Sequence, residues 1–424
     1  MINVTKLYCG LDTTGDPLRY GHSRGPGHGW PHATEQQPYP VPTSADARKP
    51  VVVWTMGRAC NLHCVHCYSD SANQRYPGEL TLEDAKVLLD DLAAFGVPAL
   101  LLSGGEPLRH PHFFELAEHA RQRGLRLTLS TNGTLIDRSV AERLKRTGFT
   151  YVGISFDGLG AVNDRFRGQS GAFDRALTGL RHLKAVGQKV GLRFTLTRRN
   201  FEALGEIFTF VEREGIDRVC FYHLVYSGRG SRLAKDDLSH AETRQALDLI
   251  LERARALNRA GKRVDVLTVD NHADGVYLYL QLLKHHALHA AKTWAFLQWN
   301  GGGANSSGVG IANVDSYGNV HPDQFWQSYT IGNVRERPFS QIWTDPHDPI
   351  LTGLRNRLPL LKGRCGTCRW KSVCGGSFRV RALQATGDPW APDPACYLTD
   401  AEITDDPMMD ATASEAAPSP VRAG

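Results

Sequence analysis

Three cysteines stand close together in the chain with the spacing C-x3-C-x2-C: Cys60, Cys64 and Cys67. This spacing puts three thiolates on one short loop and supplies no fourth. A [4Fe-4S] cluster held by three thiolates leaves one iron open to a small molecule. Zinc knuckles instead use paired C-x2-C segments with four ligands. The loop therefore favours an iron-sulfur site with an open position over a zinc loop or a chance grouping of buried cysteines.

A second group of four cysteines lies near the C-terminus: Cys365, Cys368, Cys374 and Cys396. The first two form a C-x2-C knuckle. Four thiolates close the coordination of either a [4Fe-4S] cluster or a structural zinc ion. The spacing leaves both alternatives open.

The composition is that of a soluble globular protein with one large and one smaller core, since 41% of its 424 residues are hydrophobic and 22% are charged. The start of the chain has no signal-peptide pattern, and no apolar run approaches the length of a membrane span. Nine cysteines, seven of them in two groups, favour metal binding in a reducing compartment over disulfides. We therefore expect a cytoplasmic protein. A formal charge of +5 without a Lys/Arg block indicates neither a nucleic acid nor a membrane partner.

Six short apolar runs precede residue 226 and predict strands that are buried on both faces. They are Val51–Met56, Ala99–Ser103, Arg126–Thr131, Tyr151–Phe156, Val190–Thr197 and Arg218–Leu224. Amphipathic stretches between them predict helices, and Gly96 and Gly148 stand where such helices end. The repeated strand and helix order predicts an α/β fold with a parallel sheet. Six units suit a partial (β/α)6 TIM-type barrel, although periodicity alone leaves a doubly wound sheet open.

Composition divides the rest of the chain. Residues 1–50 are rich in Gly, Pro and His and predict an irregular leader before the barrel of residues 51–235. Residues 236–308 predict a helical linker. Residues 309–404 carry the second cysteine group and predict a small cysteine-rich domain, and residues 405–424 predict a flexible tail.

Polar motifs follow the ends of the predicted strands. After the cysteine loop come Gly104-Gly105-Glu106, then Thr131-Asn132-Gly133, then Ser155-Phe156-Asp157-Gly158, with Arg193 and Thr195 on the fifth strand. Active sites of barrel folds collect at the carboxyl ends of the strands. We therefore expect these side chains at one mouth of the barrel.

This order of motifs, with an aromatic residue directly after the third cysteine, resembles the radical S-adenosylmethionine (SAM) enzymes. The resemblance implies an open six-stranded barrel and a SAM-binding [4Fe-4S] cluster on Cys60, Cys64 and Cys67. It implies that reduction of this cluster by an external one-electron donor of the ferredoxin or flavodoxin type splits SAM and yields a 5′-deoxyadenosyl radical. The residues that it assigns to SAM are Tyr68, Gly104, Gly105, Glu106, Asn132, Ser155, Asp157 and Arg193.

Within this set, the resemblance places the Gly104 to Glu106 turn at the methionyl amino group, where glycine allows close backbone approach. It places Ser155 and Asp157 near the ribose and carboxylate. Arg193 is the best candidate for the methionyl carboxylate, because a guanidinium grips a carboxylate with two hydrogen bonds.

The C-terminal cysteines are similar in spacing to the auxiliary-cluster domain of the SPASM subgroup, which implies a second [4Fe-4S] cluster rather than zinc. The hairpin that often supplies a further cysteine in that subgroup has none here, so the chain can form one auxiliary cluster at most. His321 and Asp323 occupy this place. They are candidates for a non-cysteine ligand and a substrate contact, and the alternative is that they only pin a turn.

Three segments, at residues 268–274, 299–308 and 321–326, resemble the radical SAM proteins that modify tetrapyrroles, those of heme d1 biosynthesis above all. The likeness runs from Val51 to Thr399 and implies removal of propionate side chains from didecarboxysiroheme. His272 and His321 are then candidate ligands of the substrate iron. Arg335 is a candidate partner for substrate carboxylates, and Asp323 a further substrate contact.

Three alternatives stay open. A sister reaction would convert tetrapyrrole propionates to vinyl groups by oxidative decarboxylation, as in a heme synthase. A SPASM peptide maturase would need a peptide-binding module, for which the leader is too short and too rich in Gly and Pro. An iron-sulfur electron carrier would have no use for a glycine turn and Arg193 at a barrel mouth.

Overall fold

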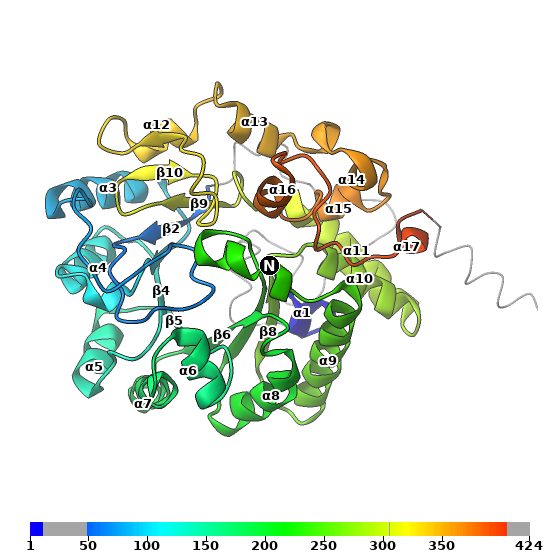
Figure 1. Ribbon diagram of the computed structural model, residues 1–424, viewed down its shortest axis with the longest axis horizontal. Coiled ribbons are helices and arrows are strands. Elements are labelled where there is room, and N and C mark those ends of the chain that lie inside the picture. The colour runs from blue at the N-terminus through cyan, green and yellow to red at the C-terminus, as the bar shows by residue number, and fades with distance from the viewer. Residues whose placement is uncertain (12–48, 305, 405–424) are drawn as a thin grey trace, which may run out of the picture.

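A computed structural model describes residues 1–11, 49–304 and 306–404. One eleven-stranded sheet runs through them in the order β1-β8-β7-β6-β5-β4-β3-β2-β9-β10-β11 (Figure 1). The strands are β1 (Ile2–Asn3), β2 (Val51–Thr55), β3 (Leu100–Ser103), β4 (Leu127–Thr131), β5 (Tyr151–Ser155), β6 (Val190–Leu196), β7 (Arg218–His223), β8 (Asp265–Val269), β9 (Ile311–Val314), β10 (Asn319–His321) and β11 (Gly332–Asn333). No helix in these ranges is long and apolar enough to cross a membrane.

The six predicted strands are β2 to β7, and each differs from its predicted bounds by one residue. They pair in sequence order, all parallel. Their apolar residues explain this arrangement, since Val52, Leu102, Leu129 and Ile154 are almost completely buried. The partial barrel predicted from the sequence is confirmed.

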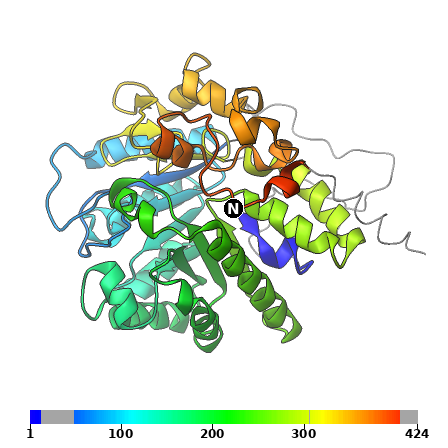
Figure 2. The ribbon, with the colours of Figure 1, turned by 45° about the vertical axis from the view of Figure 1, so that its right-hand side comes forward.

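Helices cover the outer side of this curved sheet (Figures 1 and 2). Those between the barrel strands are α3 (Leu82–Phe95), α4 (Phe113–Gln122), α5 (Arg138–Thr147), α6 (Ala161–Arg167), α7 (Ala172–Ala185), α8 (Leu204–Arg213) and α9 (His240–Arg259). Thr81 forms a capping box at the start of α3, and Gly96 ends that helix in the left-handed conformation. Local sequence signals therefore set these helix ends.

The predicted helical linker of residues 236–308 also contains a strand, β8, which pairs parallel with β7. All five residues of β8 are buried. The run is short and lies between longer helices, so its β-branched residues gave only a weak signal. The other elements of this segment are helical: α9, α10 (Ala273–Leu283) and α11 (Ala287–Trp299).

The predicted C-terminal domain shares the sheet of the barrel, because β9 pairs parallel with β2. Strands β10 and β11 continue from it as antiparallel neighbours. Short helices follow: α12 (Phe339–Trp343), α13 (Pro349–Arg355), α14 (Gly363–Thr367), α15 (Lys371–Cys374), α16 (Arg379–Thr386) and α17 (Asp400–Thr404). The barrel of six strands is thus extended by one parallel strand at each edge, β8 on one side and β9 on the other.

The prediction of an irregular leader from residue 1 is wrong for the first residues. β1 pairs antiparallel with β8, and α1 (Val4–Leu7) follows it with all four residues buried. The Thr5 hydroxyl donates to the carbonyl of Val264 and accepts from the amide of Val266, each at 2.9 Å. Pairing with β8 therefore orders this segment. The rest of the predicted leader, 12–48, and the predicted tail lie outside the described residues.

A buried ion pair joins the C-terminal part to the barrel. Arg381 Nε lies 2.7 Å from Asp393 Oδ1, and both side chains have no exposed surface. The guanidinium also donates to the carbonyls of Leu224 and Asp270, at 3.1 and 2.9 Å. Burial alone would raise the pKa of Asp393, but the charge and hydrogen bonds of Arg381 outweigh it and hold the pKa at about 2. Arg381 thus ties α16 to the ends of β7 and β8.

Candidate functional site

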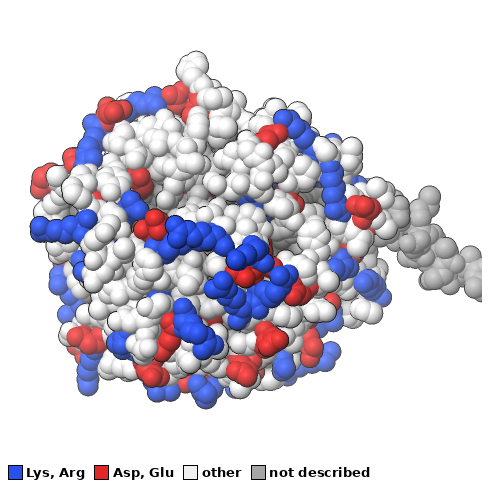
Figure 3. Space-filling model, in the orientation of Figure 1, with Lys and Arg blue, Asp and Glu red and all other residues white. Residues whose placement is uncertain are grey.

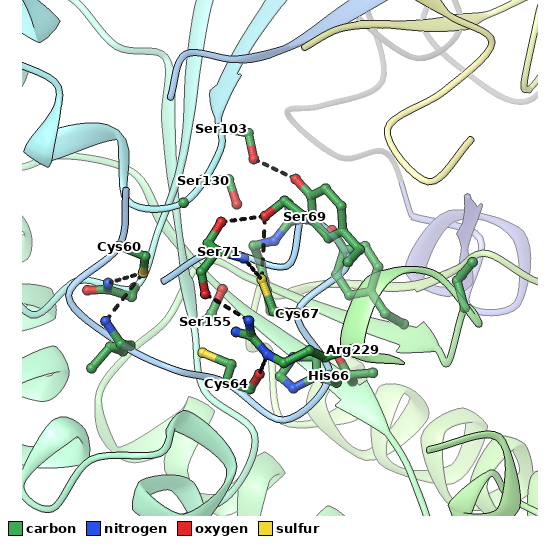
Figure 4. A pocket seen from close by; sticks show the side chains of 18 of the residues that line it. Cys60, Cys64, His66, Cys67, Ser69, Ser71, Ser103, Ser130, Ser155 and Arg229 are labelled. Carbon is green, nitrogen blue, oxygen red and sulfur yellow. Dashed lines mark hydrogen bonds between the residues drawn. The ribbon is translucent and has the colours of Figure 1, made fainter. Parts of the chain in front are cut away.

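A cavity opens at the carboxyl ends of the parallel strands, and the cysteine loop after β2 forms one wall of it (Figure 4). The three cysteines of that loop line the cavity, as do most of the residues predicted to contact SAM. These are Tyr68, Gly104, Gly105, Asn132, Ser155 and Arg193. These residues therefore lie together at one mouth of the barrel, as predicted, and their contacts with SAM stay a prediction.

The three thiols lie near one another. The pKa of Cys60 is raised to about 12, mainly by burial, and the charges of the neighbouring Cys64 and Cys67 contribute to this rise. Burial also raises the pKa of Cys64, against the charge of Arg167, which lowers it. Neighbouring buried thiols become thiolates only where positive charge offsets their repulsion. The iron atoms of a cluster supply that charge, so the donor set fits an iron-sulfur centre.

Arg229 holds the cysteine loop in place, and sequence analysis did not single it out. It belongs to the 3-10 helix η4 (Gly228–Asp236) that follows β7. Its Nε donates to the Cys64 carbonyl and its Nη1 to the Ser71 carbonyl, each at 2.8 Å. Its amide donates to the Cys67 carbonyl at 2.9 Å. The only feature of the sequence that could have indicated this role is the position of Arg229 just after a barrel strand, where active-site residues are found.

Gly228 lets η4 approach this loop. Its φ is +55°, and an added Cβ would lie 2.4 Å from the Tyr68 carbonyl oxygen and 2.5 Å from that of Cys67. Real Cβ atoms do not come so close, so an alanine here must displace the cysteine loop.

We expect Gly228→Ala to lose the SAM-binding cluster. Iron content should fall from about eight toward about four atoms per chain, the share of a second cluster. Iron analysis after anaerobic reconstitution measures this. Gly261→Ala is the matched control, because Gly261 has a φ of +69° with no atom within 4 Å of the added Cβ. Equal iron in both variants would contradict the role given to Gly228.

Asp157 does not line the cavity, and the prediction that it lies by the ribose is not supported. Its carboxylate forms ion pairs with Arg167 at 2.5 Å and with His66 at 3.2 Å. Arg167 in turn donates to Cys64 Sγ at 3.6 Å. Asp157 therefore anchors an arginine that contacts a cluster ligand. Arg167 was also missed, because nothing near position 167 in the sequence shows that it meets Cys64.

Glu106 is likewise turned away from the cavity. Its carboxylate accepts from the Thr131 hydroxyl at 2.7 Å and from the Asn132 amide at 2.8 Å. Burial raises its pKa, and these hydrogen bonds lower it. Glu106 thus links the loops after β3 and β4, and its contact with the methionyl amino group stays a prediction.

Gly105 packs directly against the cysteine loop. Its amide donates to the Gly57 carbonyl at 2.8 Å. An added Cβ would lie 2.4 Å from the Ala59 carbonyl oxygen. Only glycine therefore allows this turn to reach the residues that precede Cys60.

The remaining predicted SAM contacts have distinct surroundings. Asn132 Nδ2 donates to Asn61 Oδ1 at 2.9 Å and lies 3.9 Å from Cys60 Sγ. The Tyr68 hydroxyl lies 3.0 Å from that of Ser103. The Arg193 guanidinium stands 4.5 Å from the centre of the Tyr222 ring and has no hydrogen bond or ion pair within the described residues. Arg193 is thus available to a carboxylate.

The four candidate substrate contacts lie elsewhere. His321 Nδ1 lies 2.7 Å from the Tyr329 carbonyl and Nε2 3.5 Å from Asp315. The Asp323 carboxylate accepts from the Phe325 amide at 2.7 Å and from the Ser307 hydroxyl. Both residues are buried and pin the turn after β10. The alternative of a purely structural role for them is therefore the one that the structure supports.

Arg335 and His272 are also away from the cavity. Arg335 lies on the surface, where it pairs with Asp84 at 3.1 Å and donates to the carbonyls of Gly78 and Glu79. His272 is buried beside Gly303, whose added Cβ would lie 2.8 Å from the imidazole Cγ. The structure thus supports neither as a substrate contact.

The second cysteine group gathers at α14, α15 and the loop before α17. Burial raises the pKa of Cys374 and that of Cys396, the latter to about 11. The charges of Cys365, Cys368 and Cys396 also raise the pKa of Cys374, so the four thiols are neighbours. Across the described residues, no three His, Cys, Asp or Glu side chains are grouped as one metal ion would need.

Comparison with known proteins agrees with this geometry. The Radical SAM superfamily model matches residues 54–211. The chain is 51% identical to the Fe-coproporphyrin III synthase of Methanosarcina barkeri, over 95% of this chain and 99% of that protein. It is 49% identical to the Pre-heme d1 synthase of Dinoroseobacter shibae, over 88% of this chain and 92% of that protein.

Solved structures share the fold at low sequence identity. Streptococcus suis SuiB bound to S-adenosylmethionine superimposes with a TM-score of 0.65 at 20% identity, over 83% of this chain and 78% of that one. The anSMEcpe structure with bound AdoMet gives 0.64 at 19% identity, over 87% of this chain and 100% of that one. The partial barrel, the cavity at its mouth and the two relatives that match along almost their whole length lead to one conclusion. The chain belongs to the radical SAM superfamily of enzymes.

Proposed function

We propose that this enzyme removes propionate side chains from a siroheme-derived tetrapyrrole, didecarboxysiroheme, in heme d1 biosynthesis. The observation that carries the proposal is the 49% identity to a Pre-heme d1 synthase over 92% of that protein. Three arginines line the cavity at the barrel mouth, and among the described residues Arg193 has no ion pair, which suits a ligand that carries a carboxylate.

In this proposal the residues of the cavity bind and orient. When bound, the reduced cluster and SAM would supply the radical chemistry for hydrogen abstraction from a propionate methylene and for the carbon–carbon fragmentation that follows. Cys60, Cys64 and Cys67 hold the cluster. Arg193 pairs with the methionyl carboxylate, and the stacked Tyr222 ring fixes the guanidinium. The surrounding buried walls exclude water from the reactive centre.

For the C-terminal cysteines we propose a [4Fe-4S] auxiliary cluster. A four-iron cluster takes one thiolate per iron, whereas a zinc ion draws four thiolates to one point. The four thiols are neighbours, and the similarity of their spacing to the auxiliary-cluster domain of the SPASM subgroup favours the cluster. Arg379, fully buried nearby, lowers the pKa of Cys374 by its charge and so suits an anionic centre.

The 51% identity to a Fe-coproporphyrin III synthase favours a second candidate, formation of Fe-coproporphyrin III. The AdoMet-dependent heme synthase of Methanosarcina barkeri, 34% identical, keeps oxidative decarboxylation of propionates as a third. A peptide maturase is less favoured, since Mycofactocin maturase MftC of Mycobacterium tuberculosis matches at 33%.

Turnover of didecarboxysiroheme separates these candidates. We expect the anaerobically reconstituted enzyme, with dithionite and SAM, to form deoxyadenosine and a macrocycle that has lost whole propionate side chains. Liquid chromatography with mass spectrometry identifies the product. Fe-coproporphyrin III would instead support the second candidate, and loss of carbon dioxide alone the heme synthase reaction. Deoxyadenosine without any change in the macrocycle would contradict all three.

The external electron donor of this proposal is a ferredoxin or flavodoxin. Figure 3 shows Lys and Arg side chains near the centre of one face, with acidic side chains among them. Arg232 and Lys235 are exposed on η4, which also contacts the cysteine loop, so this helix offers a short route from the surface to the cluster.

The nine free thiols suit the reducing cytoplasm that we propose as the location.

A further inference from the structure

Three side chains form a connected polar chain that begins at the cavity. His223, the last residue of β7, lines the cavity together with Arg193 and Arg229. Its Nε2 lies 2.9 Å from Asp274 Oδ2 in the first turn of α10. The Tyr397 hydroxyl donates to Asp274 Oδ1 at 2.8 Å. None of the three side chains takes part in the functions described above.

The environment of Asp274 fixes which nitrogen of the His223 imidazole carries a proton. Asp274 is 1% exposed, and a buried carboxylate must accept hydrogen bonds to offset its lost hydration. Tyr397 supplies one of these, and His223 supplies the other. Because a carboxylate only accepts, Nε2 must carry a proton. The other ring nitrogen, Nδ1, makes no hydrogen bond to any residue that the structure describes.

The cavity needs more than one side chain that can bind a carboxylate. In the proposed function, SAM brings one carboxylate and the macrocycle brings several. Arg167 is already paired with Asp157, and Arg229 with Asp70 and loop carbonyls. Arg193 is assigned to SAM. His223 also lines the cavity, and its contact with Asp274 uses only one of its two ring nitrogens.

We propose that His223, held by Asp274 and Tyr397, binds a carboxylate side chain of the substrate macrocycle. This inference rests on the proposed function. In this arrangement Nδ1 donates a hydrogen bond to the carboxylate, while the Nε2 proton stays with Asp274. Tyr397 follows Cys396 directly, so the same chain of hydrogen bonds joins the substrate subsite to the loop of a proposed auxiliary-cluster ligand.

Binding of didecarboxysiroheme to the reconstituted enzyme, followed by the change in its Soret band, tests the inference. We expect His223→Ala and His223→Gln to raise the Kd about tenfold or more, the scale of one charge-assisted hydrogen bond. Iron content should stay at the wild-type level, which checks that both variants keep their clusters. With the methyl ester of the macrocycle, wild type and both variants should bind equally.

Asp274→Asn extends the test, because an amide no longer fixes the imidazole by its charge, and a partial rise in Kd is expected. His347→Ala is the control, since His347 is exposed and does not line the cavity. An unchanged Kd in both His223 variants, or an equal rise for the ester, would overturn the inference while wild-type binding still supports the proposed function. If the wild type fails to bind the macrocycle, the proposed function itself fails.

Discussion

Simultaneous replacement of Cys60, Cys64 and Cys67 by alanine is expected to abolish cleavage of SAM. The three thiols line one cavity, and the charges of Cys64 and Cys67 raise the pKa of Cys60, so the three act as a single ligand set. Without them the reaction returns to its uncatalysed rate, a loss on the order of 10⁶-fold or more. Deoxyadenosine should fall below detection by chromatography. Iron should drop from about eight to about four atoms per chain.

The control for this variant is Cys9→Ala, which removes a thiol that belongs to neither cysteine group and lies outside the cavity. It should keep both the iron and the deoxyadenosine of the wild type. Circular dichroism of the triple variant checks that the barrel remains folded. Deoxyadenosine from a folded triple variant would remove the basis for the proposed chemistry.

Asp393→Ala is expected to destabilise the fold by about 3–5 kcal/mol, because it leaves the charge of Arg381 buried without its partner. Thermal unfolding of the wild type and the variant measures this. Lys362→Ala is the matched control. It breaks a pair of the same 2.7 Å length, Lys362 with Asp388, whose lysine side chain is 62% exposed. A pair exposed in this way contributes about 0–1 kcal/mol.

The ion pair of Arg381 and Asp393 also makes the stability of the fold depend on pH. The pKa of Asp393 is about 2 in the folded chain, below the ordinary value of 3.8. A carboxyl group with a lowered pKa stabilises the fold above its ordinary pKa, and that contribution disappears as the pH falls from about 4 toward 2. The stability gap between wild type and Asp393→Asn should therefore narrow over this range. A gap that stays constant, or a loss no larger than that of Lys362→Ala, would contradict the role of the pair.

The sequence predicted β2 to β7 because each is a nearly continuous apolar run between helix signals. It placed the cysteine loop and Arg193 at one mouth because the carboxyl ends of parallel strands meet there. β1 and β9 were missed because their pairing partners, β8 and β2, are distant in sequence. β8 was missed because it is a short run between longer helices. A two-residue or four-residue strand carries little periodic signal of its own.

The direction in which a side chain points was the second feature that the sequence could not predict. Glu106 and Asp157 stand at strand ends, as predicted, but their carboxylates meet the Asn132 amide and Arg167 instead of the cavity. Arg167 and Arg229 support the cysteine loop through contacts that join positions 100 or more residues apart. Spacing identifies the ligands of a cluster, whereas the residues that hold the ligands depend on tertiary packing.

The pairing of β2 with β9 has a consequence for biosynthesis of the chain. Val51 is in register with Ile311, so one edge of the strand that leads into Cys60 stays bare until translation has passed residue 311. Contacts of such long sequence separation form late in folding. An exposed strand edge on a nascent polypeptide invites intermolecular pairing. This edge of β2 therefore needs shielding until residue 311 has been made, and we expect metal insertion at the cysteine loop to follow the pairing of β9 with β2.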